Sequence, residues 1–132
     1  MANKKMTAKD KTIAIIEDDD ILRSTLSDAL ADEGFALITA NDGEAGLRLV
    51  LNKHPDLILL DIVMPLMDGL TMLKKLRADQ WGGGVPVIVL TNLSDAVTIA
   101  EITEQTAYDY LVKSSWQLEA VVKKVKEKLG VA

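Results

Sequence analysis

The sequence has no cysteine, one histidine and only 4% aromatic residues. Without cysteine there is no disulfide framework and no thiolate metal site, which favours a reducing compartment. No apolar run reaches the length of a membrane span, and residues 1–5 lack the apolar segment of a signal peptide. Acidic residues outnumber basic ones, which gives a net charge of -5. This charge argues against nucleic-acid binding, which needs clustered Lys and Arg. We therefore expect a cytoplasmic protein that binds neither membranes nor nucleic acid directly.

What the sequence does have is the composition of one globular domain. Its 132 residues are 48% hydrophobic and 27% charged, enough to bury a core without covalent cross-links. Residues 1–11 are polar and rich in lysine with no apolar period, so we expect a flexible N-terminal segment. The folded domain is expected over residues 12–130.

Short apolar runs alternate with amphipathic segments along this domain. The runs predict strands over 12–16, 35–40, 57–60, 85–90 and 107–112. Apolar residues at three- and four-residue steps predict a helix after each strand. The third is expected to be capped by Asp68, the fourth to run from Ser94 or Asp95 to about Gln105, and the last to be capped at Ser114–Ser115. Five such alternations predict an α/β fold, a doubly wound five-stranded parallel sheet with helices on both faces.

Four of the five expected strands end in a residue with functional chemistry. Glu17 and Asp18 follow the first, Asp61 the third, Thr91 the fourth and Lys113 the fifth. Asp61 alone could simply begin a turn. However, the carboxyl ends of parallel strands meet at one edge of a sheet, where ligands bind in such folds. The matching chemistry at the other strand ends therefore favours a functional site.

The grouping of acids and a lysine indicates phosphoryl chemistry. Carboxylates about 4 Å apart repel by roughly 4 kcal/mol per pair at an effective dielectric constant near 20, so they need a cation or a proton. Oxygen ligands without histidine or cysteine favour Mg²⁺. The Lys113 charge and the Thr91 hydroxyl could bind the oxygens of a phosphoryl group. The site suits in-line transfer of that group onto Asp61.

These residues, in this order, resemble the receiver domains of two-component response regulators, including the single-domain chemotaxis regulator. The resemblance covers residues 12 to about 129 and includes the run Asp61-Ile62-Val63-Met64-Pro65-Leu66-Met67-Asp68-Gly69. It implies the (βα)5 flavodoxin-like receiver fold. It also implies that a histidine kinase or phosphotransfer protein phosphorylates Asp61 in a Mg²⁺-dependent reaction. Such a protein is a signalling switch and not a turnover enzyme, although it promotes its own phosphotransfer and slow dephosphorylation.

The resemblance assigns roles to two groups of residues. The implied metal ligands are the side chains of Asp18 and Asp61 and the backbone carbonyl of Val63, with Glu17 acting through water. The implied phosphoryl-binding and switch residues are Lys113, Thr91 and Tyr110. Tyr110 would change rotamer together with Thr91, although a half-buried strand aromatic is the simpler interpretation of it.

Other residues have structural interpretations, and some depart from the family pattern. Asp19 and Asp20 are expected to cap and charge the first helix, and His54 to lie on the surface. Ser114 replaces the proline that usually follows the lysine. Asn92 is larger than the small residue that usually follows the threonine and could narrow access to the phosphorylation site.

Three other functions compete with this interpretation. A flavin binder would need hydroxyl and amide donors where residues 17–20 are all acidic. An aspartyl phosphatase of the haloacid dehalogenase type would need a second Asp at position 63, where this chain has Val63. The strongest alternative is a degenerate receiver, a phosphorylation-independent protein-binding module whose chemistry is blocked by Asn92.

The sequence says less about output. The chain ends after the last expected helix, which predicts a single-domain regulator. Its signal would leave through the last two helices and the last strand, where Trp116 is a candidate contact and where two copies of the chain could pair. The downstream protein is not specified by the sequence.

Overall fold

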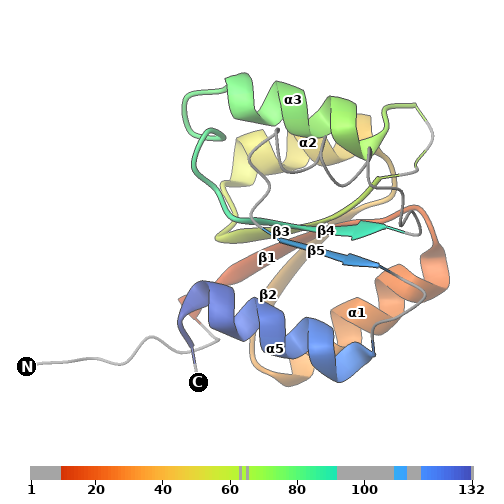
Figure 1. The fold of residues 1–132 in the computed structure, drawn as a ribbon, viewed down its shortest axis with the longest axis vertical. Helices are drawn as coiled ribbons and strands as arrows, with labels where there is room; N and C mark the ends of the chain where they lie inside the picture. The colour runs from red at the N-terminus through yellow and green to blue at the C-terminus, as the bar shows by residue number, and fades with distance from the viewer. Residues whose placement is uncertain (1–9, 63, 65, 92–108, 113–116, 132) are drawn as a thin grey trace, which may run out of the picture.

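The computed structural model describes residues 10–62, 64, 66–91, 109–112 and 117–131, with the backbone alone for 91 and 109–112. The elements are β1 Thr12–Ile16, α1 Asp20–Asp32, β2 Ala36–Ala40, α2 Gly43–Lys53, β3 Leu57–Asp61, α3 Gly69–Ala78, β4 Val87–Thr91, β5 Asp109–Val112 and α5 Leu118–Leu129. The strands pair in parallel in the order β2-β1-β3-β4-β5 (Figure 1). Strand β3 is therefore at the centre of the sheet, between β1 and β4.

Helices cover both faces of the sheet. In Figure 1, α2 and α3 lie on one face, and α1 and α5 lie on the other. Successive strand residues point to opposite faces, so Ala14 and Ile16 pack toward α2 and α3 while Ile13 and Ile15 pack toward α1 and α5. All five residues of β3 are buried. The apolar runs of the central strands are thus explained by burial on both faces.

Short polar side chains and glycine set the ends of the helices. Asp19 caps α1, where its Oδ1 accepts from the backbone N–H groups of Ile21 and Leu22, both at 3.0 Å. Asp68 caps α3, where its Oδ1 accepts from Thr71 N at 2.8 Å, as predicted. Gly34 follows the end of α1 with a φ of 101°, a conformation that glycine adopts without strain.

The prediction that Ser114–Ser115 caps the last helix is wrong. Helix α5 begins at Leu118, and its cap residue is Gln117, which makes no side-chain capping bond. A capping hydroxyl must reach the N–H groups two or three residues beyond it. The N-cap position of α5 is therefore Gln117 and neither serine, and both serines lie outside the described residues.

The doubly wound parallel sheet predicted from the alternating pattern is confirmed. Strand β1 has the predicted bounds, whereas β3 extends one residue further than predicted, to Asp61. The expected fourth helix lies outside the described residues, so the complete fivefold β–α repeat stays a prediction. No helix in the described part of the chain is long and apolar enough to cross a membrane.

One ring pair lies at the edge of the sheet where β3 and β4 begin. His54 ends α2 with a φ of 51°, and Trp81 lies in the connection from α3 to β4. Their rings stack with centroids 4.2 Å apart and planes 9° apart. His54 is exposed, as predicted, and the stack ties the two connections together at this edge.

Candidate metal centre

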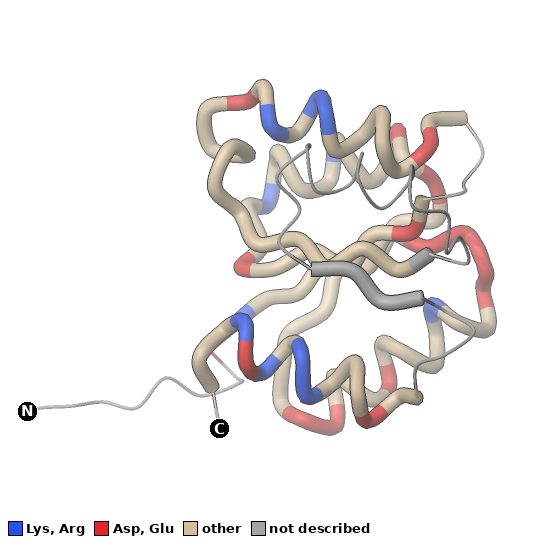
Figure 2. The backbone as a smooth tube through the Cα atoms, in the orientation of Figure 1, with Lys and Arg blue, Asp and Glu red and all other residues tan. Residues whose placement is uncertain are grey.

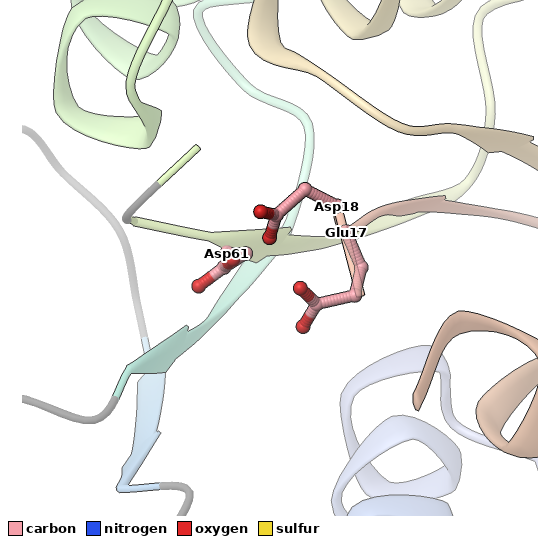
Figure 3. Close-up of side chains that lie close together, drawn as sticks. All are labelled: Glu17, Asp18 and Asp61. Carbon is pink, nitrogen blue, oxygen red and sulfur yellow. The ribbon is translucent and has the colours of Figure 1, made fainter. Parts of the chain in front are cut away.

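Three carboxylates meet where β1 and β3 end. Asp61 is the last residue of β3, and Glu17 and Asp18 follow β1 directly. One carboxylate oxygen from each of the three lies within 4.8 Å of the others. In Figure 3 the three side chains project beyond the strand ends toward the same side. The structure therefore brings together the three acids that the strand-end pattern singled out.

Burial of two of the three carboxylates strengthens the repulsion between their negative charges. The residues Glu17 and Asp61 are 0% and 3% exposed, whereas Asp18 is exposed. At 4.8 Å, two unit charges repel by about 3.5 kcal/mol at an effective dielectric constant near 20. Figure 2 shows that further acidic residues continue along the connection from β1 into α1. A positive charge among the three carboxylates would relieve this repulsion.

The donor set fits a small hard cation. All three side chains offer oxygen, which Mg²⁺ prefers, and Mg²⁺ usually keeps several water ligands beside one or two carboxylates. Asp18 faces solvent, so the group is open to water. Val63, whose carbonyl is the third predicted ligand, lies outside the described residues.

The connection from β1 into α1 is held by its own hydrogen bonds. The Asp19 backbone N–H donates to Glu17 Oε2 at 3.2 Å. Arg23 donates from Nη1 to the backbone carbonyl of Glu17 at 2.8 Å and from Nη2 to Asp20 Oδ1 at 2.5 Å. The predicted structural roles of Asp19 and Asp20 are consistent with these contacts. Our sequence reasoning missed Arg23, although its spacing of three residues from Asp20 on a helix was a usable signal.

The connection from β3 into α3 approaches the site through a glycine. Gly69 N–H donates to the carbonyl of Ile62 at 2.8 Å. A Cβ atom added to Gly69 would lie 2.2 Å from the carbonyl oxygen of Asp61. Only glycine therefore lets the first turn of α3 pack directly against the backbone of Asp61. In the same connection, Leu66 has a φ of 69° and is 80% exposed.

The remaining predicted site residues are placed by backbone alone or lie outside the described part. In the strand register, Leu90 pairs with Asp61, and Thr91 pairs with Val112, the residue before Lys113. Tyr110 pairs with Val89. The strand that ends in Thr91 therefore lies beside the strand that ends in Asp61. Lys113, Asn92, Ser114 and Trp116 lie outside the described residues, and the side-chain roles predicted for Thr91 and Tyr110 stay predictions.

The sequence is similar to those of known proteins. Residues 13–126 match the family described as the response regulator receiver domain. The regulatory protein AtoC of Escherichia coli is 40% identical over 108 residues, which cover 82% of this chain and 23% of AtoC. The chain spans between 23% and 50% of the length of the first curated relatives that it matches.

Two solved structures show the same fold. The chemotaxis protein CheY4 of Vibrio cholerae has a TM-score of 0.84 and 26% identity, with 90% of this chain and 98% of that chain covered. A CheY-like receiver domain protein of Methanospirillum hungatei has a TM-score of 0.84 and 27% identity, with coverage of 91% and 94%. The family match covers most of the chain and includes all three clustered acids. The chain therefore belongs to the response regulator receiver domain family.

Proposed function

We propose that this chain is a phosphorylation-controlled switch that accepts a phosphoryl group on Asp61. The observation that carries the proposal is the position of Asp61, buried at the end of a central strand with two other carboxylates within 4.8 Å. Receiver domains exchange phosphoryl groups with histidine kinases or phosphotransfer proteins, and we infer such a donor here.

We infer that Mg²⁺ is the cofactor of this reaction. Asp18, Asp61 and the Val63 carbonyl would hold the ion, and Glu17 would act through a water molecule. When bound, Mg²⁺ supplies positive charge that offsets both the carboxylates and the transferred phosphoryl oxygens. The all-oxygen donor set of the described acids supports this choice of metal.

The side chains of this chain then have distinct tasks in the transfer. An Asp61 carboxylate oxygen attacks phosphorus, and an O–P bond forms as the P–N bond of a donor phosphohistidine breaks; the leaving imidazole nitrogen keeps the bonding electrons. Burial of Asp61 limits the orientations of its carboxylate, which reduces the cost of ordering it for in-line attack. Lys113 and Thr91 are proposed to bind the phosphoryl oxygens.

Phosphorylation is proposed to change the conformation of the fourth helix, β5 and α5. The added charge of up to about two units would draw Thr91 and Lys113 inward, and Tyr110 would turn with Thr91. This shifts an existing equilibrium and does not create a new state. The output face would comprise the fourth helix, β5 and α5, where a downstream protein or a second copy of the chain would bind. We infer a receiver domain over residues 12–130 that dephosphorylates slowly.

Phosphorylation can be tested directly. The protein is incubated with Mg²⁺ and a small phosphodonor, and its mass is measured. We expect one added phosphoryl group in the wild type and none in Asp61→Asn. The matched control is Asp28→Asn, which removes an exposed carboxylate from α1 and should be phosphorylated like the wild type. If the wild type gains no phosphoryl group, the alternative function is favoured, that of a phosphorylation-independent protein-binding module.

A further inference from the structure

Arg23 connects the first helix to the loop that carries two of the three clustered acids. It lies one turn into α1, and its side chain is 21% exposed. The guanidinium makes two bonds in different directions: Nη1 donates to the carbonyl oxygen of Glu17 at 2.8 Å, and Nη2 donates to Asp20 Oδ1 at 2.5 Å. The backbone N–H of Arg23 also donates to the carbonyl of Asp19 at 2.9 Å.

The bond to the Glu17 carbonyl acts on both acids at once. This carbonyl belongs to the peptide group that joins Glu17 to Asp18, and that group is planar. Fixing the direction of its oxygen therefore fixes the direction in which the chain enters Asp18. The carboxylate of Glu17 is held separately by the backbone N–H of Asp19 at 3.2 Å. The backbone entering Asp18 and the side chain of Glu17 are thus set by contacts within this one turn.

We propose, on the basis of the function proposed above, that Arg23 is a positioning residue for the metal site. It holds the Glu17–Asp18 peptide so that the acids are ordered before a cation arrives. Mg²⁺ requires near-ideal octahedral geometry, so ligands that are ordered before the ion arrives raise the affinity for it. Without the hydrogen bond from Arg23, the loop must be ordered when the ion binds, and the lost conformational entropy weakens binding.

The charge of Arg23 acts in the opposite direction, so the two effects can be separated. A guanidinium repels a divalent cation, and its charge alone would weaken Mg²⁺ binding. Here the Asp20 carboxylate, 2.5 Å away, offsets that charge. Lysine would keep the charge but lose the planar fork that reaches both acceptors. A lysine variant therefore still repels Mg²⁺ but no longer fixes the Glu17 carbonyl.

The experiment compares Mg²⁺ affinity in folded wild type, Arg23→Met and Arg23→Lys. Affinity is measured by titrating MgCl₂ and following backbone amide chemical shifts, which needs no phosphorylation. Loss of contacts to metal ligands typically weakens metal affinity 10- to 100-fold. We expect about a tenfold loss in Arg23→Met and a larger loss, within this range, in Arg23→Lys, which keeps the repulsive charge. The control is Arg48→Met, which removes an arginine whose side chain is 72% exposed on α2 and lies 3.5 Å from Glu44; it should change affinity less than twofold. Excess Mg²⁺ should restore phosphorylation of both Arg23 variants to the wild-type rate.

Other outcomes contradict either the positioning role of Arg23 or the metal site itself. If Arg23→Met binds Mg²⁺ as tightly as the wild type or more tightly, the positioning role is wrong while the proposed function stands. The same holds if the urea midpoint falls but the affinity does not, because Arg23 is then only structural. If the wild type itself shows no Mg²⁺-dependent shifts at 50-fold excess over the protein, the metal site fails and the positioning role fails with it.

Discussion

Replacing Gly69 with alanine tests how closely α3 must approach the strand that carries Asp61. The added Cβ would lie 2.2 Å from the carbonyl oxygen of Asp61, 2.8 Å from Ile62 Cα and 3.0 Å from the carbonyl carbon of Asp61. Ordinary contact begins at 3.4 Å, so the backbone would have to move by about 1.2 Å. The obstructing atoms belong to the backbone, which cannot rotate away as the end of a side chain can.

The expected cost follows from this displacement. Overpacking of this kind costs about 1–3 kcal/mol, and the better helix propensity of alanine returns at most about 1 kcal/mol. We therefore expect Gly69→Ala to unfold with about 1–2 kcal/mol less free energy. In urea this lowers the midpoint by roughly 0.5–1 M for an m-value near 2 kcal/mol/M. Because the displaced atoms belong to Asp61 itself, the phosphorylation rate should also fall, by about tenfold to a hundredfold.

Gly84 provides a matched control for the same substitution. A Cβ at Gly84 would have nothing within 4 Å. Gly84→Ala should leave the phosphorylation rate unchanged and raise stability by no more than about 1 kcal/mol, through the unfolded chain. The assays are urea unfolding followed by circular dichroism and mass spectrometry of phosphorylated protein over time. Equal midpoints and equal rates in the two variants would refute the close approach of α3 to Asp61.

Four other variants test the site and the connection from β3 to α3. Asp18→Ala should abolish both Mg²⁺-dependent amide shifts and phosphorylation, and normal phosphorylation of it would show that the ligand assignment is wrong. Thr91→Ala should still be phosphorylated but should lose the phosphorylation-dependent amide shifts of residues 94–105; unchanged shifts would contradict the switch. Val63 and Leu93 follow Asp61 and Thr91 by two residues each, and their side chains cannot hydrogen-bond a water that attacks the phosphoryl group. Val63→Asn combined with Leu93→Glu should therefore shorten the phosphorylated lifetime, measured after the donor is removed in excess Mg²⁺; an unchanged lifetime would contradict this role. Leu66→Gly should stabilise the protein by about 0.5–1 kcal/mol in urea unfolding, because leucine with positive φ is strained and this one is exposed.

Burial and spacing made much of the fold predictable. Strands buried on both faces must be continuously apolar, so β1 and β3 were visible as runs of aliphatic residues. The three carboxylates were predictable for a related reason, since parallel strands bring their carboxyl ends to one edge. The cap at Asp68 followed from the short range of its side-chain bond.

Other features depend on contacts that the sequence pattern does not encode. The start of α5 at Leu118 was missed because hydroxyl residues earlier in the chain suggested a cap. The bond from Arg23 to the Glu17 carbonyl was missed because a backbone acceptor leaves no residue-type signal. The positive φ of Leu66 was equally invisible, since that conformation is disfavoured for leucine. These three features are set by the path of the backbone.

The stacked rings of His54 and Trp81 give the protein an optical probe remote from its chemistry. The stack lies near the start of β3, and the clustered acids lie where β3 ends. The two ends of β3 are about 13 Å apart at roughly 3.3 Å per residue. Trp81 is one of two tryptophans, so Trp116→Phe would leave it as the sole indole emitter. A change in its emission spectrum on Mg²⁺ binding would then show that binding at the carboxyl end of β3 alters the structure at the opposite end of the strand.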